Sequence, residues 1–99
     1  MYYVYIIFSE STNSFYKGQT NDLHDRIHRH NNGFENYTRK GIPWRLIWSS
    51  SFLERSEAMA LEKKVKNLTR ERLISFMLKY SNGIAGPDEF LLLEKLSGC

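Results

Sequence analysis

One carboxylate lies where a helix should be apolar. Residues 57–68 follow a helical pattern, and on a helical wheel Glu62 falls between Ala58 and Val65, inside the apolar face. A carboxylate that faces a core is costly unless it is paired or binds a metal ion. Two interpretations follow. Glu62 either reaches solvent or pairs with a buried arginine, or it is a metal ligand or an acid–base residue.

A cationic pair occupies a second predicted helix, over residues 22–31. Arg26 and His30 are four residues apart, so their side chains share one face of this helix. His30 falls beside the inward-facing Leu23 and Ile27, and Arg26 lies at the rim of that face. Either residue alone would more often be structural than functional. Together with an inward glutamate from another helix they form a more specific set, for which the structural and functional interpretations are evenly balanced.

Tyrosines are concentrated at the start of the chain. Tyr2, Tyr3, Tyr5 and Tyr16 all lie within the first 16 residues. Tyrosine in a strand usually fills a core and keeps its hydroxyl near water. A phenol held near a cation can also transfer a proton. Both interpretations stay open.

The elements that carry these residues have the order β-β-α-β-α-α. The segments 2–8 and 15–19 predict an antiparallel hairpin, and 44–52 predicts a third strand. Helices are expected over 22–31 with Asn21 as N-cap, over 57–68 with Ser56 as N-cap, and from Thr69 to Tyr80. The basic stretch 34–41 has no periodicity and is expected to be a loop. The pattern predicts an α+β domain in which helices flank a three-stranded antiparallel sheet.

Length and composition indicate one folded domain. The chain has 99 residues, of which 41% are hydrophobic, as in an ordinary globular sequence. Its net charge of +3 is compatible with a polyanionic partner without requiring one. The single cysteine, Cys99, excludes an intrachain disulfide and fits a reducing compartment. No apolar run is long enough to span a bilayer and the first residues lack a signal-peptide pattern, so we expect no membrane partner and a cytoplasmic location.

The ordered set of candidate residues resembles the GIY-YIG nuclease superfamily. The motifs that carry the resemblance are Tyr3-Val4-Tyr5, Tyr16-Lys17-Gly18, Arg26, His30 and Glu62. The resemblance covers roughly residues 1–80. It is closest to small bacterial members of about this length, and more distant to the N-terminal nuclease domain of the excision-repair nicking subunit. It implies a GIY-YIG endonuclease domain over 1–82, followed by a tail at 83–99 with a short amphipathic helix.

The resemblance also implies an activity and roles. The expected reaction is hydrolysis of phosphodiester bonds in nucleic acid with Mg²⁺ or Mn²⁺, and Glu62 is the implied metal ligand. Arg26 would bind the phosphate, Tyr16 or Tyr5 would activate water, and His30 would relay or hold a proton. The residues do not distinguish DNA from RNA; we take DNA as the expected substrate, DNA repair as the setting, and sequence specificity as low.

Further residues are candidates for contact with the nucleic acid. Gly18 would let the substrate approach the backbone closely. Arg39, Lys40 and Arg45 would bind phosphates, although solvated surface charge is the commoner role for any one of them. The leucine-rich segment 91–96 either packs back on its own domain or makes a protein contact, so the expected state is a monomer or a weak homodimer.

Departures from the family pattern, above all a missing Asn, and the modest net charge keep an alternative function open. Tyr3 and Lys17 stand where the motifs have Gly and Ile, and residues 74–77 lack the Asn that several members carry. The alternative is a non-catalytic nucleic-acid-binding or adaptor domain that retains the fold.

Overall fold

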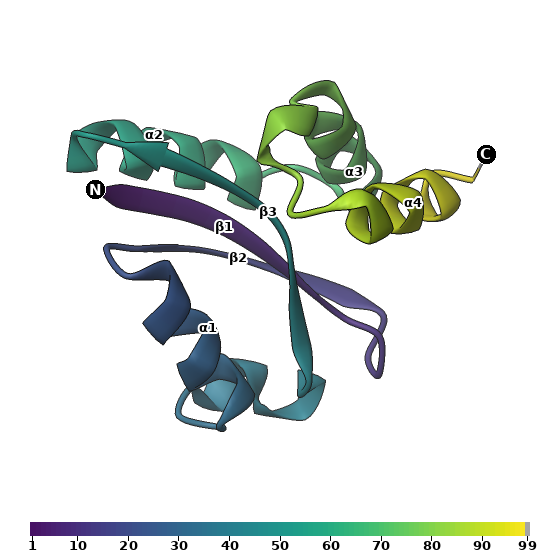
Figure 1. The fold of residues 1–99 in the computed structure, drawn as a ribbon, viewed down its shortest axis with the longest axis horizontal. Coiled ribbons are helices and arrows are strands. Elements are labelled where there is room, and N and C mark those ends of the chain that lie inside the picture. The colour runs from purple at the N-terminus through teal and green to yellow at the C-terminus, as the bar shows by residue number, and fades with distance from the viewer. Residues whose placement is uncertain (99) are drawn as a thin grey trace.

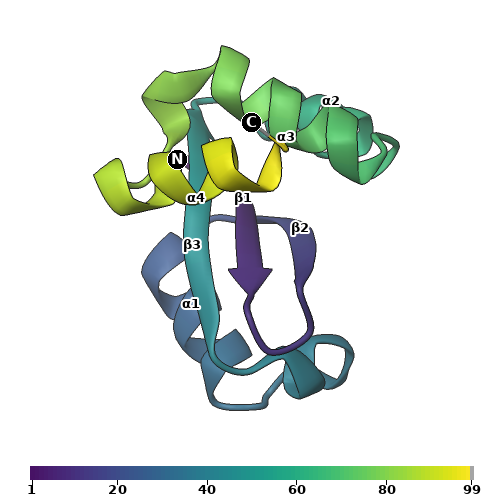
Figure 2. The same ribbon diagram turned by 90° about the vertical axis from the view of Figure 1, so that its right-hand side faces the viewer.

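The computed structural model describes residues 1–98 and shows a three-stranded antiparallel sheet with helices on both faces (Figure 1). Its strands are β1 (Tyr2–Ser9), β2 (Ser14–Thr20) and β3 (Trp44–Phe52), in the order β2-β1-β3. Figure 2 shows β1 in the middle of the sheet. Both pairings are antiparallel, and Tyr5 lies opposite Gly18 on one side and Ser49 on the other. The predicted α+β fold is therefore confirmed.

The alternation of β1 divides the interior into two cores. Val4, Ile6 and Phe8 face the larger core, whereas Tyr5 and Ile7 face a smaller core. All five side chains are buried, as the aromatic and β-branched composition of the strand predicts. The side chain of Tyr5, a candidate site residue, thus points to the opposite face of the sheet from Val4, Ile6 and Phe8.

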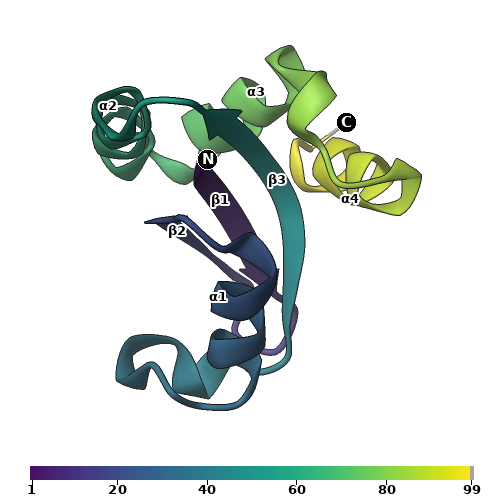
Figure 3. The same cartoon turned by 60° about the vertical axis from the view of Figure 1, so that its left-hand side comes forward.

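The helices divide between the two faces of the sheet (Figure 3). The smaller core is covered by α1 (Leu23–Asn31), which is followed by a 3₁₀-helix, η1 (Asn36–Gly41). The larger core is covered by α2 (Arg55–Lys66), α3 (Arg70–Lys79) and α4 (Pro87–Leu96), with a short 3₁₀-helix, η2 (Ser81–Gly83), between the last two. No helix among residues 1–98 is long and apolar enough to cross a membrane.

The helix starts differ in part from the sequence predictions. Asp22, and not Asn21, caps α1, because its side chain accepts a hydrogen bond from the Asp25 backbone N–H at 3.0 Å. The helix α2 begins at Arg55, one residue before the predicted cap, and has no side-chain cap. Thr69 caps α3 as predicted. Part of the predicted loop 34–41 is the helix η1.

The tail packs on its own domain through α4. Leu93 is fully buried in the larger core and Leu92 and Leu96 pack against it, while Leu91 stays 62% exposed. Most of the leucine-rich surface is therefore used within the chain. The division at residue 82 and the oligomeric state stay predictions. Cys99 lies outside the described residues.

Candidate active site

Arg26 and Glu62 line one small pocket. Arg26 comes from α1 and Glu62 from α2, which lie on opposite faces of the sheet. Both residues line the pocket at the β2 edge, which has a volume of about 410 Å³. Its remaining walls are polar or charged apart from one aromatic ring, and consist of Tyr2, Gln19, Thr20, Asn21 and Arg55. A cation and a carboxylate thus share a polar cleft open to solvent.

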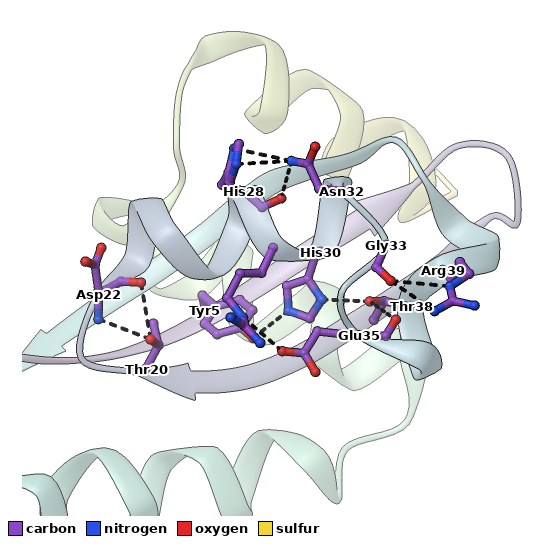
Figure 4. Close-up of polar contacts among 11 residues, drawn as sticks. Tyr5, Thr20, Asp22, His28, His30, Asn32, Gly33, Glu35, Thr38 and Arg39 are labelled. Carbon is purple, nitrogen blue, oxygen red and sulfur yellow. Dashed lines mark hydrogen bonds and ion pairs between the residues drawn. The ribbon is translucent and has the colours of Figure 1, made fainter.

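A row of buried hydrogen bonds lies behind this pocket, under α1 (Figure 4). The Tyr5 hydroxyl is 2.8 Å from His30 Nε2, and His30 Nδ1 is 2.7 Å from Thr38 Oγ1. Tyr5, His30 and Thr38 are all at most 1% exposed. The Thr38 hydroxyl lies 3.4 Å from the Glu35 backbone carbonyl, to which it donates. The row joins β1, α1 and η1.

The direction of these bonds assigns the tautomer of His30. Because Thr38 donates to the Glu35 carbonyl, its oxygen accepts from His30 Nδ1–H. The lone pair on Nε2 then accepts from the Tyr5 hydroxyl. Burial lowers the pKa of His30 below its ordinary value of 6.5, and the charges of Arg26 and Arg29 lower it further against the opposing carboxylate of Glu35. A neutral imidazole is therefore the form that suits this row.

The two motif tyrosines differ in their surroundings. Burial raises the pKa of Tyr5 well above its ordinary value of 10, the phenol of Tyr16 raises it further, and the positive charge of Arg26 opposes the rise. Tyr16 is only partly buried, and its ring lies edge-on to the His30 ring with 5.1 Å between centroids. Both tyrosine rings lie beside the same imidazole, but only the Tyr5 hydroxyl bonds to it and only Tyr16 is partly exposed.

Gly18 has a packing role in the structure, and its predicted contact with the substrate stays a prediction. A Cβ built on Gly18 would collide with the Tyr5 hydroxyl and lie 2.6 Å from Tyr5 Cζ. The Tyr5 ring therefore comes so close to the backbone at residue 18 that only a glycine fits there. Gly18 makes room for the tyrosine that bonds to His30.

Glu62 is partly shielded and already has one partner. Its side chain is 23% exposed, and Oε2 lies 3.3 Å from Lys66 Nζ. This ion pair agrees in part with the first interpretation, in which Glu62 has a cationic partner. The partner is a lysine on the same helix and not a buried arginine. The pocket does offer a hard cation an oxygen-rich donor set, because the amides of Gln19 and Asn21 line it with the carboxylate. Among residues 1–98 no group of three or more His, Cys, Asp or Glu side chains could hold a metal ion by itself, so an ion here would need water and substrate oxygens as well.

The predicted phosphate-binding cations are dispersed. Arg39 is exposed but donates to the Gly33 carbonyl and to Asn36 Oδ1, so it holds the turn before η1, and Lys40 is exposed beside it. Arg45 lies on the opposite face of the sheet from Tyr5. Its guanidinium is 2.8 Å from Glu89 and 3.2 Å from Glu10. The structure thus does not bring Arg45 to the pocket, because two carboxylates engage it on the α4 side.

Sequence reasoning missed two contributors. Thr38 fixes the tautomer of His30, yet it lies in a basic stretch without periodicity and no sequence signal marks it. Arg55 adds a second guanidinium to the pocket. Arg55 shares a face with Glu62, seven residues on, only because α2 begins at Arg55; the predicted start at residue 57 left it outside the helix.

Comparison with known proteins defines the class. The family model described as the GIY-YIG catalytic domain matches residues 1–77, and the chain therefore belongs to the GIY-YIG family. Its relatives include the UPF0213 protein YazA of Bacillus subtilis (strain 168), 46% identical over 61 residues that make up 61% of this chain and 62% of YazA. The UPF0213 protein SAG0778 of Streptococcus agalactiae is 32% identical over 81% of this chain and 91% of that protein.

A solved structure extends the likeness to the fold. The solution NMR structure of the UPF0213 protein BH0048 from Bacillus halodurans has a TM-score of 0.53 and 36% identity, and the match covers 92% of this chain and 94% of that chain. The family resemblance and the fold class are thereby confirmed. Family membership indicates a nuclease-type function, nucleic acid as partner and divalent metal use in general terms.

Proposed function

We propose that this protein is a divalent-metal-dependent endonuclease that hydrolyses phosphodiester bonds in nucleic acid, with DNA as substrate and low sequence specificity. The observation that carries the proposal is the pocket in which Arg26 and Glu62 meet from opposite faces of the sheet, beside the Tyr5–His30–Thr38 row. A residue pair this far apart in sequence, of opposite charge and around a polar cleft, fits recognition of a phosphate together with a cation.

Glu62 would hold the metal ion, with the amides of Gln19 and Asn21 near it. A bound Mg²⁺ or Mn²⁺ supplies charge stabilisation at the scissile phosphate and the leaving oxygen. Lys66 would hold the carboxylate in place until then, since the ion pair at 3.3 Å restricts its rotation. The arrangement agrees with the habit of Mg²⁺ to use one or two carboxylates plus water and substrate oxygens.

Arg26 would bind the phosphate through its planar set of donors. Its guanidinium lines the pocket and is also close enough to Tyr5 and His30 for its charge to lower the pKa of both. A side chain in this position connects the substrate to the buried row. It stabilises negative charge that develops on the phosphate and keeps the imidazole neutral.

The proton of the attacking water would pass to Tyr16. Tyr5 is the weaker candidate, because burial holds its proton and Gly18 encloses its hydroxyl. Tyr16 is partly exposed, so its phenol can release its own proton to solvent and then take the proton of the attacking water. His30 holds its proton on Nδ1, because its Nε2 already accepts from the Tyr5 hydroxyl. In this scheme Tyr5 and Thr38 position the imidazole, and Tyr16 acts on the water.

Cleavage of labelled branched, single-stranded and duplex DNA in Mn²⁺ tests the proposal. Glu62→Gln should abolish cleavage, whereas Glu57→Gln, an exposed carboxyl on the same helix, should leave it unchanged. Arg26→Lys keeps the charge but loses the planar donors, and we expect a fall of at least about tenfold. Cleavage that survives Glu62→Gln would remove the mechanism. A rate that falls more for Tyr5→Phe than for Tyr16→Phe, with folding intact, would reverse the assignment of the two tyrosines.

The alternative is a non-catalytic nucleic-acid-binding domain. The ion pair between Glu62 and Lys66 favours it, because a carboxylate in an ion pair is less available to a metal ion. Ile74 and Met77, in the stretch without the family's Asn, are both buried in the larger core, so no polar group from that part of α3 reaches the pocket. Salt-dependent DNA binding without turnover on any substrate in Mg²⁺ or Mn²⁺ would establish this function.

A further inference from the structure

A second pocket lies at the other edge of the sheet. Its volume is about 720 Å³, and it is formed by the outer strand β3, the helices α2 and α3, and the turn η2. Ser49–Ser51 of β3 provide one wall. Because β2 and β3 are opposite edges of the sheet, this pocket is separate from the one that contains Arg26 and Glu62.

One wall of this β3-edge pocket is a ladder of aromatic rings. Trp48 and Phe76 are 5.3 Å apart between centroids, and Phe76 and Tyr80 are 4.9 Å apart. The indole N–H of Trp48 donates to the Tyr80 carbonyl at 2.8 Å. Trp48 is only 3% exposed, whereas Tyr80 is 46% exposed. The ladder is therefore anchored in the core at one end and presents a ring to solvent at the other.

Two lysines stand over this ladder. Lys64 Nζ is 5.8 Å from the centroid of Phe76, and Lys79 Nζ is 5.5 Å from that of Tyr80. Neither forms an ion pair within residues 1–98, and no Asp or Glu lines the pocket. Both ammonium groups therefore make cation–π contacts with aromatic rings, and no carboxylate within residues 1–98 neutralises them in an ion pair. Hydroxyl groups of Ser50 and Ser81 complete a surface suited to an anion.

We propose that the β3-edge pocket binds a nucleoside phosphate. The base stacks on Tyr80, and the phosphate lies between Lys64 and Lys79, with the serine hydroxyls as hydrogen-bond donors. An aromatic face beside unpaired lysines is the combination by which proteins bind nucleotides without reading their sequence. The same chemistry is offered by a free nucleotide and by one nucleotide of a single strand. The site lies outside the proposed cleavage pocket and does not depend on cleavage.

Amide and indole NMR spectra of the 99-residue chain test the site directly. The titrations use an adenosine monophosphate, a deoxyadenosine octanucleotide, inorganic phosphate and a glutamate-rich peptide, all with a chelator so that no cleavage occurs. We expect the Trp48 indole signal and the amides of Ser81–Gly83 to shift with the two nucleotide probes. A tighter dissociation constant for the octanucleotide identifies a strand as the ligand, and equal constants identify the free nucleotide.

Variants separate the site from general charge. Lys64→Gln with Lys79→Gln should weaken binding at these signals at least tenfold, and Tyr80→Leu should weaken it severalfold. The control pair Arg72→Gln with Lys95→Gln removes the same charge from exposed positions outside the pocket and should change binding less than twofold. Spectra that match the parent elsewhere show that each variant is folded. Unmoved Trp48 and Ser81–Gly83 signals, equal shifts with the glutamate peptide, or equal losses in both pairs would overturn the proposal.

Discussion

Gly18→Ala is the most direct test of how the site is built. The new Cβ would lie 2.6 Å from Tyr5 Cζ and 2.9 Å from Cε1, well inside the roughly 3.5–4.0 Å of a good carbon contact. Tyr5 is fully buried, so moving its ring by about 1 Å costs about 1–3 kcal/mol as overpacking. The same movement breaks its 2.8 Å bond to His30, which adds about 1–2 kcal/mol.

The expected total is a loss of roughly 2–5 kcal/mol in the free energy of unfolding. For a domain of this size that corresponds to a fall in Tm of at least about 8 °C. Urea denaturation followed by circular dichroism measures the first quantity, and calorimetry the second. Gly86→Ala is the control, because its Cβ meets only the end of the flexible Glu89 side chain, so a loss of about 1 kcal/mol or less is expected.

A double-mutant cycle shows whether the loss comes from this contact. Tyr5→Phe removes the hydroxyl that the Cβ meets and also the bond to His30, which can be lost only once. Gly18→Ala should therefore cost roughly 1 kcal/mol less in the Tyr5→Phe background than in the parent. Additive losses, or a loss below about 0.5 kcal/mol for Gly18→Ala alone, would refute the packing of Gly18 against the Tyr5–His30 pair.

Three further predictions concern the buried row and the far side of the sheet. Thr38→Val keeps the shape but removes the acceptor for His30 Nδ1–H, so unfolding in urea should show a loss of about 1–3 kcal/mol. The lowered pKa of His30 means that the unfolded chain binds a proton that the folded chain excludes. The free energy of unfolding should therefore fall as the pH falls below about 6.5, by at most about 1.4 kcal/mol per pH unit from this residue. The variant His30→Gln should remove that part of the pH dependence. A slope unchanged by His30→Gln would contradict the lowered pKa. Arg45→Gln should cost about 1 kcal/mol or less, through its pair with Glu89, and leave the rate of DNA cleavage unchanged; a lost rate with intact folding would return Arg45 to the substrate site.

The fold could be predicted from the sequence because its signals are local. The segment 2–8 alternates between two apolar environments, and Thr69 marks the start of α3 correctly. His30 was expected to face inward from its position on the wheel, and it is 1% exposed. These features depend on periodicity and capping, which act over a few residues.

The site could be predicted only in part, because its contacts are long-range. Tyr5 and His30 are 25 residues apart, and the threonine that fixes the imidazole lies in a segment without any pattern. Arg45 was assigned to the substrate from its charge, yet its partner Glu89 is 44 residues away on a helix that the family motifs do not include. A single sequence states which side chains are charged, but the partners that engage them depend on packing between elements.

The width of the sheet explains how a glutamate on the apolar side of α2 stays partly exposed. The helix α2 lies over β1 and the edge strand β2, and its Ala58 and Val65 are fully buried there. Glu62 lies between them on the wheel, but among residues 1–98 no fourth strand continues the sheet beyond β2. Its side chain therefore lies at the edge of the sheet, where it lines the pocket with Gln19 and Arg26 and stays 23% exposed, which lowers the desolvation cost of a core carboxylate. A fourth strand beyond β2 would cover this side chain, so the inward glutamate depends on the edge position of β2.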